Sequence, residues 1–67
     1  MIKTLTEEQA KEQGYRCLTR PYRPSQEHMW RKVVADMKRG NIECCLVSKV
    51  VSYGEDGNFK GVSVWRK

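Results

Sequence analysis

The 67-residue chain lacks any long apolar run, and its longest uninterrupted apolar stretch is only Cys44 to Val47. A membrane-spanning helix needs about 20 consecutive apolar residues, so the sequence predicts no contact with a membrane. The opening residues, MIKTLTEEQ, are also too polar for the apolar region of a signal peptide. These absences favour a cytoplasmic protein.

Residues that bind metals or form disulfide bonds are scarce. The chain has three cysteines, Cys17, Cys44 and Cys45, and one histidine, His28. An odd number of cysteines with two of them adjacent does not suit a disulfide framework, so we expect reduced thiols. A structural zinc site needs about four ligands at suitable spacing, and the sequence contains no CxxC pair. We therefore predict no metal site.

Catalytic motifs are missing as well. Cys44 or Cys45 with His28 is the only combination of thiol and imidazole, and nothing in the spacing brings these residues together. No glycine-rich loop leads from a strand into a helix with the lysine that a phosphate cradle needs. The sequence predicts a protein that is not an enzyme and that needs no cofactor, with His28 facing solvent.

The length allows one small domain over residues 1–67. Thr6 and Gln9 form a capping-box pattern and Gly14 is a stop signal, which together predict a short helix over residues 7–13. Its apolar residues are few, Leu5 and Ala10, so we expect residues 1–14 to lie at the periphery or to fray.

A longer helix is predicted in the middle of the chain. Ser25 follows Pro24 as an N-cap, and Gly40 stands at the expected C′ position, which gives a helix over residues 25–39. Residues at the spacing of a buried helical face are Met29, Trp30, Val33, Val34 and Met37. Before this helix, alternation predicts a strand over residues 15–19, and two prolines predict an irregular connection over 20–24.

The last third of the chain predicts a β-hairpin. Residues 42–53 are rich in β-branched side chains, residues 54–58 form a dense turn signal, and residues 59–65 return as a strand. Apolar side chains occur on both faces of these strands. Either a bulge near residues 48–49 shifts the phase, or both faces of the sheet are partly buried.

These elements predict a small α+β domain of two layers in the order α-β-α-β-β. One long amphipathic helix packs on a mostly antiparallel sheet that ends in the C-terminal hairpin. The pairing of the first strand is left open. If helix 25–39 is a crossover, strand 15–19 runs parallel beside strand 42–53 through a right-handed connection.

The net charge of +5 is concentrated in the middle of the chain. Residues 1–14 have two lysines and three glutamates, for −1, and residues 40–67 have four cations and three acids, for +1. Residues 15–39 have seven cations and two acids, for +5. On the long helix, the i, i+4 pairs Glu27 with Arg31 and Lys32 with Asp36 account for part of this charge without any ligand.

The leading hypothesis is a non-enzymatic module that binds an anionic partner, most plausibly nucleic acid. Arginine offers forked donors to phosphate and tyrosine offers a stacking face, and the two alternate before the long helix. The residues predicted to meet the partner are Arg16, Arg20, Arg23, Arg31, Lys32, Lys38 and Arg39, with Tyr15 and Tyr22 as stacking residues. No groove-reading motif is present, so sequence-specific DNA recognition is not expected.

The alternative hypothesis is a protein-interaction module, for example a homodimer or an accessory inhibitor of the kind that compact mobile-element genomes encode. Tyr53, Phe59 and Trp65 would form an exposed aromatic patch if the valines of the last strand face the long helix. Otherwise the short N-terminal helix or a second subunit covers them.

Overall fold

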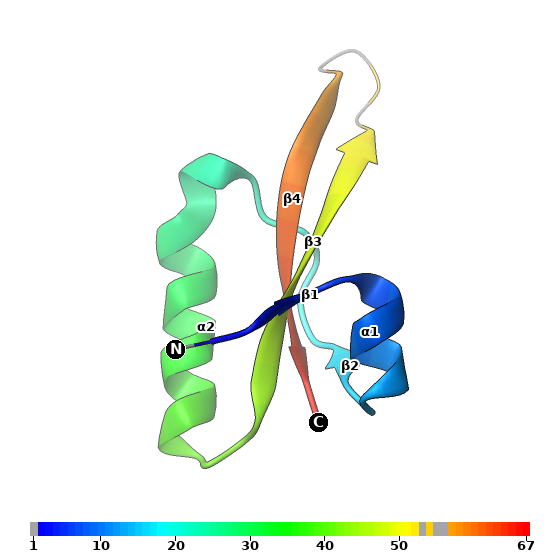
Figure 1. Ribbon diagram of the computed structural model, residues 1–67. Helices are drawn as coiled ribbons and strands as arrows, with labels where there is room; N and C mark the ends of the chain where they lie inside the picture. Colours follow the sequence, from blue (N-terminus) through cyan, green and yellow to red (C-terminus); the bar gives the residue numbers. More distant parts are fainter. Residues whose placement is uncertain (1, 53, 55–56) are drawn as a thin grey trace.

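The computed structural model describes residues 2–52, 54 and 57–67 and has an α+β fold (Figure 1). Its elements are β1 (Thr4–Leu5), α1 (Glu7–Glu12), β2 (Arg16–Cys17), the 3-10 turn η1 (Pro24–Gln26), α2 (Glu27–Arg39), β3 (Cys44–Ser52) and β4 (Asn58–Arg66). The four strands form one sheet in the order β1-β3-β4-β2. The β3–β4 hairpin and the long helix lie where the sequence predicts them.

Strand pairing corrects the parallel arrangement considered for the first predicted strand. β2 pairs antiparallel with β4, and the parallel pair is β1 with β3. β1 has no predicted counterpart, because a strand of two residues is too short to show alternation. The sheet is therefore mixed but mostly antiparallel.

Both faces of the sheet are partly buried, and the hairpin needs no bulge to achieve this. β3 and β4 pair in unbroken register from Cys44 opposite Arg66 to Ser52 opposite Asn58. Leu46 and Val64 pack with Val34 of α2, whereas the alternate positions Cys45, Val47 and Trp65 pack with Ala10 of α1. In Figure 1 the two helices accordingly lie on opposite sides of the sheet.

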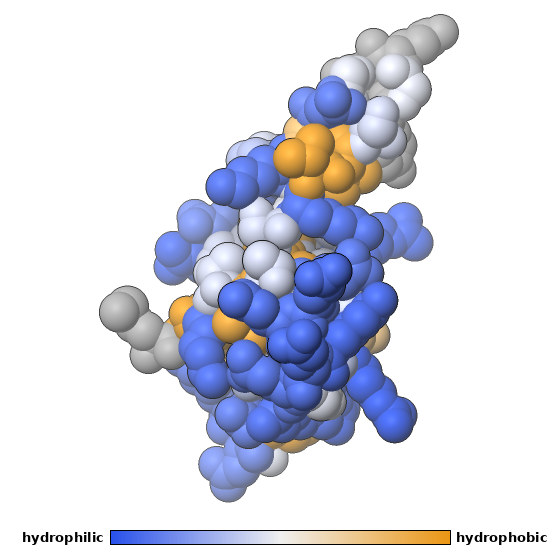
Figure 2. Space-filling view, turned by 45° about the vertical axis from the view of Figure 1, so that its right-hand side comes forward, coloured by the Kyte–Doolittle hydropathy of each residue, from blue (hydrophilic) through white to orange (hydrophobic). Residues whose placement is uncertain are grey.

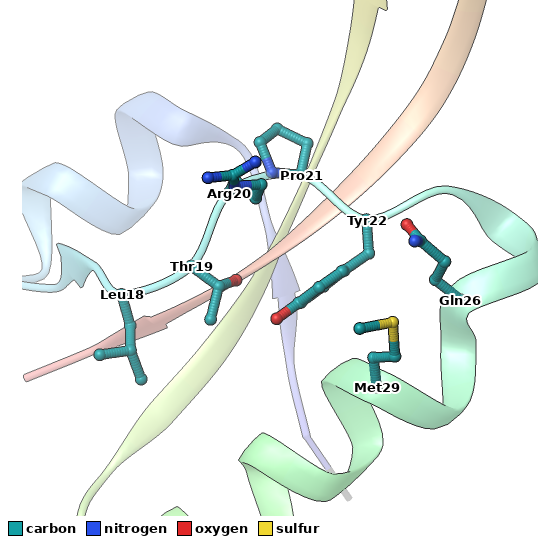
Figure 3. Close-up of a pocket in the computed structure, with 7 residues that line it drawn as sticks. All are labelled: Leu18, Thr19, Arg20, Pro21, Tyr22, Gln26 and Met29. Carbon is teal, nitrogen blue, oxygen red and sulfur yellow. The ribbon is translucent and has the colours of Figure 1, made fainter.

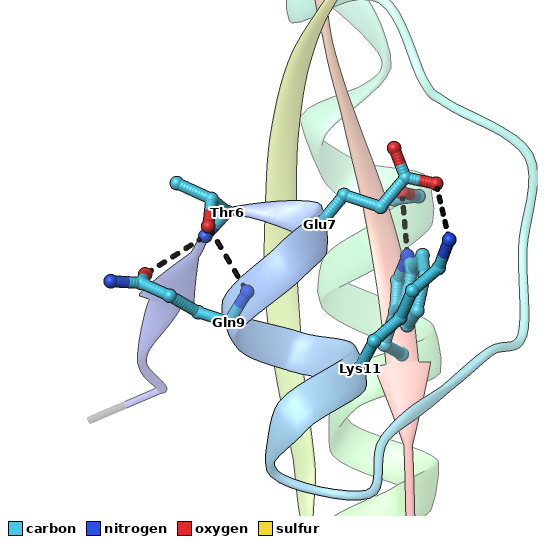
Figure 4. Close-up of polar contacts among 6 residues, drawn as sticks. Thr6, Glu7, Gln9 and Lys11 are labelled. Atoms are coloured by element: carbon cyan, nitrogen blue, oxygen red, sulfur yellow. Dashed lines mark hydrogen bonds and ion pairs between the residues drawn. The ribbon is translucent and has the colours of Figure 1, made fainter.

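The N-terminal segment forms a short, capped helix. Thr6 and Gln9 form the predicted capping box: the Gln9 backbone N–H donates to Thr6 Oγ1 at 3.2 Å, and the Thr6 N–H donates to Gln9 Oε1 at 3.1 Å (Figure 4). Gly14, with φ of 86°, ends the helix as predicted. Ala10 is completely buried, whereas the other residues of α1 are exposed or half-buried, so the helix lies at the surface with one side chain in the core.

Both ends of α2 differ from the predicted caps. Ser25 lies within η1, and the turn is closed by the Arg23 backbone N–H, which donates to Gln26 Oε1 at 3.0 Å. At the other end Gly40 has an ordinary φ of −86°, and Asn41 takes the left-handed conformation with φ of 55°. The N–H of Ile42 donates to the carbonyl of Met37 at 2.9 Å, which completes a Schellman motif with Asn41 at C′.

The segment after β2 follows the edge of β4 along most of its length. The backbone N–H groups of Leu18 and Thr19 both donate to the carbonyl of Val64, and Tyr22 then pairs with Val62. Gly61 lies beneath this segment, where a Cβ atom would stand 2.7 Å from Cβ of Pro21. The predicted strand over residues 15–19 is thus shortened to two residues, because the chain bulges outward before it rejoins β4.

Candidate functional site

Among the residues that the structure describes, the aromatic side chains predicted as a contact surface do not form one. Trp65 is only 6% exposed because α1 covers it, so its prediction as an exposed interface residue is wrong. Phe59 lies under the Arg23 guanidinium, whose Cζ is 5.0 Å from the ring centroid. Tyr53 lies outside the described residues. Tyr15, predicted to stack on a partner, is 3% exposed and packs in the same cluster as Trp65.

The hydroxyl of Tyr15 is part of a polar contact at the C-terminal end of β4. It donates to Glu43 Oε1 at 3.2 Å, and Lys67 Nζ lies 3.3 Å from Glu43 Oε2. Burial, and then the charge of Glu43, raise the pKa of Tyr15. The hydrogen bond from Lys67 and its charge lower the pKa of Glu43. Glu43 is therefore held as the anion between two donors.

Tyr22 and Arg20, neighbours in the predicted stacking segment, point in different directions. In Figure 3 the Tyr22 ring extends between Thr19 and Met29, while the Arg20 side chain lies on the other side of the connection beside Pro21. These residues line a hollow of about 560 Å³ between the connection and α2. Met29, predicted for the buried helical face, is 41% exposed there. Arg20 and Tyr22 therefore border the same hollow, with their side chains pointing in different directions.

The basic residues of α2 lie on other surfaces than the three arginines before it. Arg31 pairs with Glu27 at 3.2 Å, as the i, i+4 spacing predicts, and its Cζ lies 5.5 Å from the Trp30 ring centroid. Arg31 and Lys38 border a hollow that also includes Ile2, on the β1 side. The described residues Lys32 and Asp36 form no ion pair, which corrects the second predicted helix pair.

Lys32 and Arg39 are turned away from the sheet. They lie about 160° and 140° around the helix axis from Val34, the residue of α2 buried against the sheet. Both side chains are exposed. The structure does not place the seven predicted basic residues on one surface, and their roles in binding stay predictions.

A different grouping of cations forms beside β2. Arg16 stands directly opposite Arg66 in the β2–β4 ladder, and Lys67 follows at the end of the chain. With Gly14, Cys17 and Leu18 these three cations line a hollow of about 470 Å³, here called the terminal hollow. Neither Arg16 nor Arg66 forms an ion pair with an acidic group within the described part of the chain. The arginine side chains thus concentrate positive charge at one end of the sheet.

A second hollow lies on the α1 face of the sheet and shares Cys17 with the first. It lies between α1 and the connection after β2, has a volume of about 300 Å³, and is here called the α1 groove. Lys11, Arg20 and Lys49 line it, together with Glu7, whose Oε1 is 3.6 Å from Lys11 Nζ (Figure 4). Cys17 lines both hollows. Figure 2 shows that hydrophilic side chains cover most of this side of the molecule.

We define the β2 cation strip as the six cations that line these two hollows: Arg16, Arg66, Lys67, Lys11, Arg20 and Lys49. Only Arg16 and Arg20 are among the predicted binding residues. The other four come from residues 1–14 and 40–67, whose net charges are only −1 and +1. Sequence reasoning missed them because only the strand pairing and the packing of α1 bring them to β2.

The cysteine and histidine side chains do not meet. Cys45 is buried on the α1 face of the sheet, and Cys44 lies near Lys38 in the last turn of α2. His28 is in the first turn of that helix, ten residues before Lys38, which corresponds to about 15 Å along the helix axis. Burial raises the pKa of the Cys44 and Cys45 thiols, which disfavours their thiolates. Cys17 is exposed, and its thiol donates to the carbonyl of Thr19 at 3.2 Å.

The described residues contain no group of three or more His, Cys, Asp or Glu side chains placed to hold a metal ion. Among the helices described, none is long and apolar enough to cross a membrane. Comparison with protein-family models, with curated proteins and with solved structures gives no match for this chain.

Proposed function

We propose that this protein is a small, non-catalytic nucleic-acid-binding module that contacts phosphates along the β2 cation strip. The observation that carries the proposal is the placement of Arg16 directly opposite Arg66, without an acidic partner for either among the described residues. Like charges opposed across a strand pair are destabilising, by roughly 0.2–1 kcal/mol. A bound anion removes this repulsion.

The chemistry of the strip favours phosphate. Each guanidinium presents a planar fork of donors that matches two phosphate oxygens, and two such forks meet at the terminal hollow. Lys67 adds a third cation, although it already forms an ion pair with Glu43. Arg66 Nε already donates to the backbone oxygen of Lys67 at 3.3 Å, so the donors left for an incoming anion are those of Arg16 and the remaining N–H groups of Arg66.

The arrangement along β2 favours a polymer of anions over a single one. The Cα atoms of Arg16 and Arg20 are four residues apart, so at most about 14 Å separates them. They line two hollows that adjoin at Cys17. Arg16 and Arg66 share the sheet face of Cys44 and α2, whereas Cys17 shares the α1 face with Trp65. A sugar–phosphate backbone that contacts both hollows must therefore pass round the edge strand β2 at Cys17.

Fluorescence anisotropy with a labelled single-stranded oligonucleotide tests the proposal. The double variant Arg16→Gln/Arg66→Gln removes two charges from the terminal hollow, and Lys32→Gln/Arg39→Gln removes two from the solvent face of α2. We expect the first variant to bind at least tenfold more weakly than the second at about 50 mM salt. Equal losses in the two variants would mean that only net charge matters, and the strip would not be the site. An unmodified protein that leaves the anisotropy unchanged would contradict the function itself.

A further inference from the structure

The α1 groove differs from the terminal hollow because its cations surround an apolar floor. Val47, Ser63 and Trp65 form the floor, and all three are at least nine-tenths buried. Pro21 closes the side toward β4, where it packs over Gly61. The groove therefore offers a ligand apolar contact below and positive charge around the rim.

The polar groups of the floor are satisfied by one another. Trp65 Nε1 donates to Ser63 Oγ at 3.2 Å, and the Ser63 hydroxyl donates to the carbonyl of Val47 at 3.5 Å. Because these groups have partners, the floor makes mainly van der Waals contact with a ligand. Such a floor accepts any flat apolar group and does not distinguish one hydrogen-bonding pattern from another.

The rim is suited to an anion. Lys11 comes from α1, Arg20 from the connection and Lys49 from β3, so the charges approach the groove from three sides. The one acid that lines the groove, Glu7, forms its ion pair with Lys11. Among the described lining residues this leaves Arg20 and Lys49 without a carboxylate partner.

The size of the groove restricts its occupant. Its volume of about 300 Å³ is at the lower end of the range for small-molecule sites, about 300–1,000 Å³. A helix or a strand of another protein does not enter such a space. One flat ring with an attached anionic group does.

We infer that the α1 groove takes one unpaired nucleotide, with its base against the apolar floor and its phosphate between Arg20 and Lys49. The inference rests on the proposed function, since the neighbouring phosphates of the same strand would lie in the adjoining terminal hollow. It adds that the protein prefers single strands, because a base held in a duplex cannot reach the floor. It also predicts little preference among bases.

The test uses the indole of the floor as the reporter. The chain has two tryptophans, so Trp30→Phe leaves Trp65 as the only one, and its emission is recorded during titration with adenosine monophosphate. We expect a saturable change that inorganic phosphate at equal concentration does not reproduce. If Trp30→Phe does not fold, the indole N–H resonance of Trp65 in the unmodified protein supplies the same readout.

Matched variants assign the signal to the groove. Arg20→Gln/Lys49→Gln should lower the affinity for adenosine monophosphate at least fivefold, and Lys32→Gln/Arg39→Gln should leave it unchanged. The inference is overturned if adenosine monophosphate leaves Trp65 unperturbed, or if phosphate alone gives the full change. Oligonucleotide binding that still depends on Arg16 and Arg66 would then leave the proposed function standing. Nucleotide binding in the groove without oligonucleotide binding would contradict the proposed function alone.

Discussion

Arg16 and Arg66 face each other across the β2–β4 ladder, and Arg66 also stands opposite Cys44 on its other side. Residues directly opposed in an antiparallel pair share one face of the sheet, so both guanidinium groups lie on the same side at its end. A carboxylate at either position would have removed the repulsion. The protein instead keeps two arginines together, at some cost in stability.

Arg16→Gln should raise the stability of the protein while it weakens oligonucleotide binding. Removing one of two opposed like charges relieves a repulsion worth roughly 0.2–1 kcal/mol. Urea denaturation at low salt should show this gain, and the difference should vanish near 1 M salt, where the screening length is only about 3 Å. A variant that is less stable at low salt would show that Arg16 serves the fold and not the partner.

Gly61→Ala should destabilise the protein by about 1–3 kcal/mol, the usual cost of overpacking. The added Cβ would stand 2.7 Å from Cβ of Pro21 and 3.1 Å from Cγ2 of Val51. To accommodate it, the connection after β2 must move away from β4. Denaturant midpoints measure the loss.

Gly40→Ala is the matched control, because the backbone at residue 40 accepts an alanine without a steric clash. Gly40 has a φ of −86°, and the nearest atom to an added Cβ would be Cδ1 of Ile42 at 3.5 Å. We expect a gain of about 0.4–1 kcal/mol from the reduced entropy of the unfolded chain. If Gly40→Ala lowered the free energy of unfolding as much as Gly61→Ala, the loss at residue 61 could not be attributed to the clash with Pro21.

Thr6→Ala should loosen α1 and so expose Trp65. The substitution removes the acceptor for the Gln9 N–H, at a cost of about 0.5–2 kcal/mol. Because α1 covers Trp65, the emission of this tryptophan in a Trp30→Phe background should shift to longer wavelength. Thr6→Ser keeps the hydroxyl and should restore the original spectrum. An unshifted spectrum in Thr6→Ala would mean that the cap does not hold the helix on the sheet.

Glu43 should contribute to stability in a pH-dependent way. Its pKa in the folded protein lies below the ordinary value of 4.5, first because Lys67 donates to it. The contribution is therefore complete above about pH 4.5 and is lost as the pH falls through the lowered value. Between neutral pH and about pH 3, the free energy of unfolding should fall less in Glu43→Gln than in the unmodified protein. An equal fall in the free energy of unfolding of both proteins would contradict the contribution of the contact between Glu43 and Lys67.

Most of the fold could be predicted from patterns among neighbouring residues. The capping box at Thr6, the helix stop at Gly14, the apolar face of α2 apart from Met29, and the hairpin each depend on a few neighbouring residues, and the sequence predicts them. The burial of Trp65 does not follow from such patterns. Apolar side chains on both faces of β4 are compatible with a covered or an exposed second face, and only the packing of Ala10 decides between them.

The candidate site was predictable only in part, for a related reason. Arg16 and Arg20 stand out because residues 15–39 are strongly basic, whereas Lys11 and Lys49 lie in ranges, 1–14 and 40–67, with net charges of only −1 and +1. Arg66 lies fifty residues and Lys67 fifty-one residues beyond Arg16, and only the antiparallel pairing of β2 with β4 brings them to it. The net charge of a sequence range does not predict a site whose cations come from several separate strands.

The most direct test of the central claim is the salt dependence of single-stranded oligonucleotide binding. Each phosphate neutralised on a single strand contributes about −0.7 to the slope of log K against log salt concentration. Arg16→Gln/Arg66→Gln should therefore flatten the slope by about 1.4 relative to Lys32→Gln/Arg39→Gln. Identical slopes in the two double variants would contradict phosphate binding at the β2 cation strip.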